Sequence, residues 1–99
     1  MFEENQPGYM FCDVNVVNTE NVVKIIWYKD EIPIGDDSNL NITIKNDTRF
    51  LFFPKLSTKL HNGVYRCAVL LANDQRIDSE YNLMVEILGI FLYFQLLNE

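Results

Sequence analysis

The sequence alternates between short runs rich in apolar residues and polar segments that contain turn-forming residues. Valine, isoleucine and aromatic residues are frequent in these runs, and such side chains pack well on a pleated sheet. Helical periodicity is hard to find outside the last dozen residues, so the pattern predicts an all-β domain. The predicted strands number seven and cover residues 9–17, 22–28, 32–34, 40–45, 49–53, 64–72 and 77–87.

Two of these segments carry further information about the sheets. Residues 40–45 alternate between apolar and polar, which places Leu40, Ile42 and Ile44 on one face. Pro33 confines residues 32–34 to a sheet edge, because proline has no N–H to donate to a neighbouring strand. We predict that residues 55–63 form a polar connection, and that two stacked sheets bury the apolar faces.

The length and composition indicate one small folded domain. With 99 residues and 48% hydrophobic side chains, the chain is too apolar to remain disordered. We place the domain at residues 1–87 and an apolar C-terminal tail at residues 88–99. The net charge of -6 leaves no basic face for a phosphate backbone, which argues against nucleic acid as a partner.

The C-terminal tail has two interpretations. Residues 87–97 are strongly apolar but interrupted by Gln95, and the run is about half as long as a membrane-spanning helix needs to be. We therefore predict no transmembrane span in this chain. The tail is either an extra strand or helix docked on the domain, or a truncated or read-through end.

The two cysteines, Cys12 and Cys67, are too few for a four-ligand zinc site and form no Cys-x-x-Cys pair. They are either buried free thiols in an intracellular protein or one disulfide in a secreted protein. Glycosylation sequons at Asn41 and Asn46 favour secretion weakly, because eleven asparagines make chance matches common. No signal peptide is visible, so the chain is a fragment or truncated product, or its native form stays inside the cell.

Four residues match the pattern of an immunoglobulin domain. Cys12, Trp27 and Cys67 occur in the order and approximate spacing of that fold, and Tyr65 lies two residues before the second cysteine. The resemblance implies an immunoglobulin-like two-sheet sandwich with a short or missing first strand, since little precedes Gly8. It also implies a Cys12–Cys67 disulfide between the sheets, Trp27 packed over it, and a tyrosine corner at Tyr65.

One position departs from this pattern. Immunoglobulin domains usually have aspartate two residues before the glycine that precedes the corner tyrosine, and here that residue is His61. The salt bridge that this aspartate makes is therefore not expected in this chain.

A narrower resemblance rests on residues 26–30 (IWYKD), 49–54 (RFLFFP) and 62–67 (NGVYRC). Together they resemble the membrane-distal immunoglobulin domain of the interleukin-1 receptor family, which includes soluble and poxviral decoys. The resemblance implies an extracellular or secreted protein-binding domain, with an interleukin-1-family cytokine as ligand and neighbouring immunoglobulin domains in a longer chain. The alternatives are a cell-adhesion or other immune-surface domain, or a truncated isoform without ligand binding.

No enzymatic or metal chemistry is expected. His61 is the only histidine and falls at a turn where no cleft is predicted, while the resemblance commits both cysteines to a disulfide. Asp13, Asp36 and Asp37 lack the spacing of a calcium-binding loop, and no phosphate-binding glycine loop occurs. We therefore predict no catalytic, metal-binding or cofactor-binding residue and no cofactor.

The outward faces of the predicted strands are unusually apolar. If the two cysteines and the tryptophan point inward, alternation turns their neighbours toward solvent. Such apolar patches are typical of protein interfaces, unless bulges shift the register or the tail covers one patch. The outward residues are Ile26, Tyr28, Ala68, Leu70 and Met84 on one sheet and Tyr9, Phe11, Phe50 and Phe52 on the other. We select Ile26, Tyr28, Leu70, Met84, Phe11 and Phe52 as interface candidates.

Overall fold

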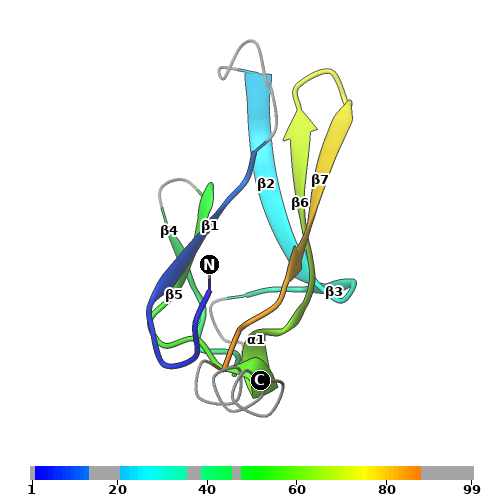
Figure 1. The fold of residues 1–99 in the computed structure, drawn as a ribbon. Helices are drawn as coiled ribbons and strands as arrows, with labels where there is room; N and C mark the ends of the chain where they lie inside the picture. The colour runs from blue at the N-terminus through cyan, green and yellow to red at the C-terminus, as the bar shows by residue number, and fades with distance from the viewer. Residues whose placement is uncertain (1, 14–20, 36–38, 46–47, 88–99) are drawn as a thin grey trace.

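The structure is a computed structural model, and it describes residues 2–13, 21–35, 39–45 and 48–87 (Figure 1). Within these ranges the chain folds into two antiparallel sheets and a single turn of helix. The elements are β1 (Gly8–Phe11), β2 (Val22–Lys29), β3 (Ile32–Pro33), β4 (Thr43–Lys45), β5 (Phe50–Phe53), α1 (Thr58–His61), β6 (Gly63–Leu71) and β7 (Arg76–Leu83).

The strand order confirms the predicted all-β sandwich. One sheet has the order β1-β5-β4 and the other has the order β3-β2-β6-β7. The two sheets lie face to face, as Figure 1 shows, and their facing side chains form the core. The observed topology is that of an immunoglobulin-like domain with three strands opposite four.

Several strands are shorter than predicted. β4 begins only at Thr43, because Asn41 adopts a φ of 54° that interrupts the extended backbone before it. β7 ends at Leu83, after which the backbone N–H of Val85 donates to the side-chain oxygen of Asn62 at 2.7 Å. The strand predicted over residues 9–17 ends at Phe11, and residues 14–17 lie outside the described part of the chain.

The predicted polar connection at residues 55–63 contains α1. Ser57 caps this helix, since its Oγ accepts the N–H of Leu60 at 3.3 Å. Leu56, directly before the cap, is buried in the core. The connection therefore anchors one end of the sandwich instead of only linking β5 to β6.

A glycine and an aspartate form a tight contact at the start of β6. Gly63 has a φ of +153°, and a Cβ atom there would lie 2.7 Å from Oδ2 of Asp30. Oδ1 of Asp30 accepts the N–H of Val64 at 2.9 Å, which ties the β2–β3 turn to β6. Only glycine leaves enough space for this carboxylate.

The first strand of the fold is reduced to a single bridge, as the sequence predicted. Glu3 pairs in parallel with Glu86, and the N–H of Glu4 donates to the carbonyl of Glu86 at 2.8 Å. The chain then turns away, because Gln6 bonds to Leu56. Among the described residues, this leaves β1 as an edge strand of its sheet.

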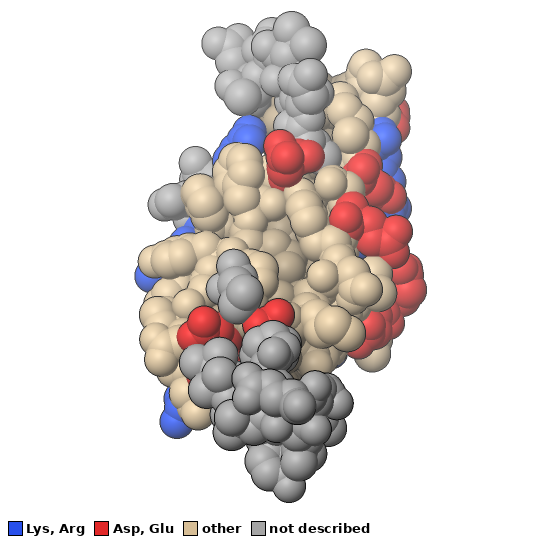
Figure 2. All heavy atoms as spheres, viewed as in Figure 1, with Lys and Arg blue, Asp and Glu red and all other residues tan. Residues whose placement is uncertain are grey.

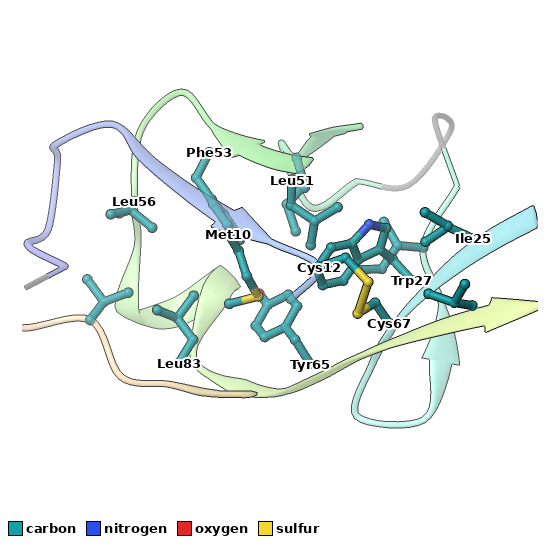
Figure 3. Packing of buried hydrophobic residues seen from close by; sticks show 14 residues of the cluster. Met10, Cys12, Ile25, Trp27, Leu51, Phe53, Leu56, Tyr65, Cys67 and Leu83 are labelled. Carbon is teal, nitrogen blue, oxygen red and sulfur yellow. A yellow bond between two sulfur atoms is a disulfide. The ribbon is translucent and has the colours of Figure 1, made fainter. Parts of the chain in front are cut away.

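The centre of the sandwich holds the disulfide and the indole (Figure 3). Cys12 and Cys67 are bonded across the two sheets with their Cα atoms 5.9 Å apart, which excludes the interpretation of two free thiols. Trp27 lies directly beside Cys67 on the neighbouring strand and is buried. Its Nε1–H donates to the carbonyl of Thr48 at 2.7 Å. Thr48 lies between β4 and β5, so the indole also ties β2 to the opposite sheet.

Candidate protein-binding surfaces

The corner at the base of the sandwich is built around Tyr65 and His61. The Tyr65 hydroxyl donates to the carbonyl of His61 at 2.7 Å, which is the tyrosine corner that the sequence implied. Tyr65 is fully buried, and this burial raises the pKa of its hydroxyl. The hydroxyl therefore stays protonated and acts as a structural donor.

His61 takes the place of the usual aspartate as a neutral group. Its Nδ1 accepts the N–H of Ser57 at 2.9 Å, so the proton resides on Nε2, which contacts the carbonyl of Leu40 at 2.7 Å. The ring edge packs against Phe53 with centroids 5.0 Å apart. Complete burial lowers the pKa of His61. Both ring nitrogens are occupied, so His61 has no free atom for acid–base catalysis.

Four aromatic side chains cover the outer surface of the β1-β5-β4 sheet. We name this surface, formed by Tyr9, Phe11, Phe50 and Phe52, the aromatic face. The register places Tyr9 opposite Phe52 and Phe11 opposite Phe50. The ring centroids of each pair are 4.8 Å apart, and Tyr9 also meets Phe50 edge-on at 6.4 Å. Tyr9 is 57% exposed and Phe11 is 44% exposed.

The aromatic face has a cation at its margin. Lys45 of β4 holds its Nζ 4.5 Å from the centre of the Phe52 ring. An ammonium over an aromatic ring is stabilised by the ring quadrupole. The surface therefore consists of closely packed aromatic rings, a residue type enriched at protein interfaces, with Lys45 at its margin.

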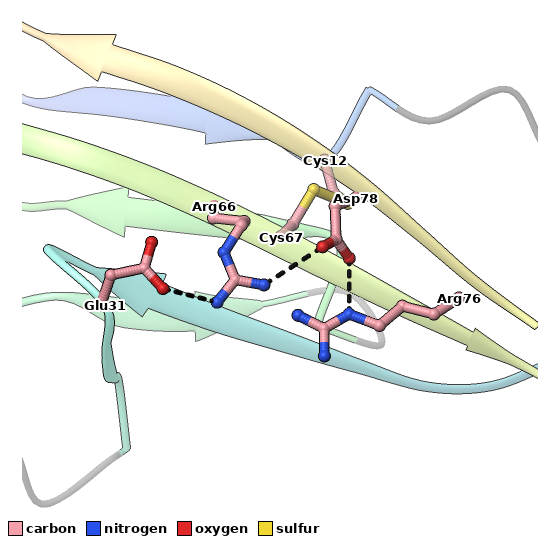
Figure 4. A network of polar contacts seen from close by, with 6 residues as sticks. All are labelled: Cys12, Glu31, Arg66, Cys67, Arg76 and Asp78. Atoms are coloured by element: carbon pink, nitrogen blue, oxygen red, sulfur yellow. Dashed lines mark hydrogen bonds and ion pairs between the residues drawn. A yellow bond between two sulfur atoms is a disulfide. The ribbon is translucent and has the colours of Figure 1, made fainter.

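The outer surface of the opposite sheet is organised by Arg66 and is not simply apolar (Figure 4). Arg66 bonds to Glu31 at 3.0 Å and to Asp78 at 3.2 Å, and its guanidinium lies 4.2 Å from the centre of the Tyr28 ring. Arg76 bonds to the same Asp78 at 2.8 Å, and this contact is the main reason that the pKa of Asp78 is lowered. We call these five residues the Arg66 network.

The predicted apolar patch on this sheet is therefore only partly present. Ile26, Tyr28 and Leu70 are half-buried, and Ala68 is fully buried although alternation predicted it outward. Met84 is 73% exposed, but it lies after the end of β7. The arginine and its acidic partners come from separate turns and strands, so no pattern in the sequence indicates that they converge.

The glycosylation candidates and the acidic residues considered for calcium are not part of these surfaces or lie outside the described residues. Asn41 is exposed, whereas Asn46, Asp36 and Asp37 lie outside the described residues. In the described ranges, no three His, Cys, Asp or Glu side chains gather where they could hold a metal ion. No helix among the described residues has the length and apolar character needed to span a membrane.

Comparisons with known proteins show the fold but no closer relationship. No family model and no curated protein matches the sequence. The V domain of amphioxus IgVJ-C2 superimposes with a TM-score of 0.64 at 24% identity, covering 87% of this chain and 98% of that chain. The insect immune protein hemolin gives 0.67 at 17% identity, covering 84% of this chain and 21% of that chain. Drosophila OTK extracellular domains 3–5 superimpose with a TM-score of 0.63 at 19% identity, covering 85% of this chain and 31% of that chain.

These likenesses establish an immunoglobulin fold. This chain spans almost the whole amphioxus domain but only a fraction of the hemolin and OTK chains. No interleukin-1 receptor is among these three structures, so the narrower resemblance remains a prediction.

Proposed function

We propose that this immunoglobulin domain binds a protein partner through its aromatic face. The observation that carries the proposal is the cluster of four closely packed aromatic rings on a sheet surface, with Tyr9 and Phe11 exposed. Aromatic side chains bring much contact area with little conformational freedom to lose, and they dominate the energetics of protein interfaces. Solvent-exposed aromatic clusters of this kind are uncommon on surfaces without a partner.

The opposite sheet is the weaker candidate. There the Arg66 network already pairs the guanidinium with two carboxylates and with the Tyr28 ring. A partner would have to displace or desolvate these charges, which costs binding energy. The disulfide supports an oxidising, extracellular location for the proposed interaction.

A binding assay against a panel of candidate ligands distinguishes the aromatic face from the outer surface of the opposite sheet. The full chain is applied to a panel of extracellular protein domains that includes interleukin-1-family cytokines, the ligand class implied by the sequence resemblance. A Phe11→Ser/Phe52→Thr variant should lose the ligand, and a Tyr28→Ser/Leu70→Ser variant should retain it. Circular dichroism controls for folding. A ligand lost only in the second variant, or no ligand in the panel, would contradict the proposal.

A further inference from the structure

In the part of the chain that the structure describes, the side of the sandwich between β1 and β7 is open. A groove of about 310 Å³ lies there, with Phe2 and Tyr81 among the residues that line it. The lining is mostly apolar and consists of Phe2, Tyr9, Met10, Phe11, Tyr81, Asn82 and Leu83. Figure 2 shows uncharged surface over this side of the molecule, with acidic side chains above it, below it and along its border.

The backbone of β1 turns toward this groove polar groups that no described strand pairs with. The N–H of Cys12 donates to the carbonyl of Arg49, so Cys12, and by alternation Met10, bond toward β5. Tyr9 and Phe11 therefore direct their N–H and C=O groups to the open side. The N–H of Asp13 confirms the alternation, because it turns the same way and donates to the Tyr81 hydroxyl. Within the described residues β1 has no neighbouring strand on this side, so these two donors and two acceptors are available to an added strand.

Among the described edge strands, the residues of β3, β4 and β7 protect against strand addition, whereas those of β1 do not. β3 carries Pro33, β4 carries Lys45, and β7 carries Arg76 with two carboxylates. Proline and charged side chains are the usual means by which edge strands avoid pairing with another chain. The four residues of β1 include neither a charge nor a proline.

The charge around the open side defines the chemistry of the occupant. Residues 2–13 and 80–87 contain five of the 14 acidic residues of the chain and none of its eight basic residues. Excluding them leaves nine acidic against eight basic residues, so these two segments hold nearly all of the net charge of -6. The acidic residues are Glu3, Glu4, Asp13, Glu80 and Glu86.

From these observations we infer that β1 takes up an extended polypeptide segment as a fourth strand of its sheet. The segment has apolar side chains at alternate positions, so that one row enters the groove, and lysine or arginine at its ends. Antiparallel addition is expected, because antiparallel pairing is slightly more stable per residue. A second copy of this chain is a poorer occupant, since its own open side is equally acidic. The inference uses the edge of β1 and does not rest on the proposed function of the aromatic face.

A blocked peptide, Lys-Val-Thr-Val-Thr-Val-Lys, is the probe, and the same peptide with glutamate ends is its control. Binding to the full chain is followed by NMR, with hydrogen exchange of the backbone amides. The lysine peptide should slow exchange at Tyr9 and Phe11 by about tenfold at saturation. The glutamate peptide should not bind.

Two variants of one residue distinguish strand addition from contact with the aromatic face. Phe11→Pro removes the open-side N–H but leaves the bonds to β5, and should abolish peptide binding. Phe11→Val keeps the N–H and removes the ring, and should still bind, whereas loss of the ring should weaken a ligand of the aromatic face.

Further variants test whether acidic residues around the groove are needed to bind the basic ends of the peptide. Asp13→Asn/Glu80→Gln/Glu86→Gln should weaken binding of the lysine peptide by at least about threefold, while Glu31→Gln/Asp74→Asn should not. No binding of the lysine peptide at 1 mM, or protection of amides outside β1, would overturn the inference. A dimer that sedimentation detects and Phe11→Pro abolishes would assign the edge to a second copy and would also overturn it.

Discussion

The buried neutral histidine predicts a specific response of stability to pH. His61 is fully buried, and its Nδ1 accepts the N–H of Ser57 while Nε2 faces the carbonyl of Leu40. A second proton on the ring would point a donor at the Ser57 donor and would place a charge in the core. The folded pKa is therefore lowered from the ordinary value of 6.5. In the unfolded chain the ring takes up this proton freely.

The direction in which stability changes with pH follows from this difference in proton uptake between the folded and unfolded chain. Because the unfolded state binds the proton first, the contribution of His61 is complete above pH 6.5 and is lost as the pH falls toward the lowered folded pKa. A single proton changes the free energy of unfolding by at most about 1.4 kcal/mol per pH unit. Between pH 6.5 and 5.5 the loss is at most about 1 kcal/mol, the limit reached when the folded ring stays neutral throughout that range. Protonation of Asp30 and Asp78 lowers stability only at more acidic pH, since their pKa values are lowered from an ordinary 3.8.

Urea unfolding followed by circular dichroism at several pH values between 5.5 and 7.5 measures this loss. The matched variant is His61→Gln, which has no group that titrates in this range at residue 61. Its stability at pH 7.5 should be lower by about 1–3 kcal/mol, because the Ser57 N–H or the Leu40 carbonyl loses its partner. Its stability should then be almost independent of pH. A flat profile for the natural chain, or the same slope in both proteins, would refute the reasoning.

Three further predictions concern the fold. Replacing both disulfide cysteines (Cys12→Ala/Cys67→Ala) should lower stability in urea by about 4 kcal/mol, because the bridge spans 55 residues in sequence, and intact mass with and without reductant checks that it forms. Gly63→Ala should cost about 1–3 kcal/mol, because a φ of +153° is strained for alanine and its Cβ would collide with Asp30, and Asp30→Ala in the same chain should recover only the part due to the collision. Tyr65→Phe should lower stability by about 1–3 kcal/mol by leaving a buried carbonyl without its donor, and an unchanged melting midpoint would contradict this.

The centre of the fold could be predicted from the sequence through its resemblance to immunoglobulin domains, because the order and spacing of Cys12, Trp27 and Cys67 match that pattern. A cysteine pair with a tryptophan beside one of them fills the space between two sheets, and the structure has that arrangement. The outward direction of Phe11 and Phe52 likewise followed from alternation, since their neighbours Met10 and Leu51 are buried.

Features that depend on local backbone geometry or on distant partners could not be predicted. The length of β4 is set by the positive φ of Asn41, which no apolar pattern reveals. Arg66 meets its carboxylates from the β2–β3 turn and β7 only after the sheet has formed. The N-terminal signal of α1 was present at Ser57, but a helix of four residues is too short to show periodicity.

The position of Trp27 gives the domain an optical signal of its own state. It is the only tryptophan of the chain, and it is buried beside a sulfur–sulfur bond. An indole away from water emits at shorter wavelength, and a neighbouring disulfide quenches that emission. Unfolding should therefore shift the fluorescence to the red and brighten it, and reduction without unfolding should brighten it at an unchanged wavelength. One spectrum would thus separate loss of the cross-link from loss of the fold.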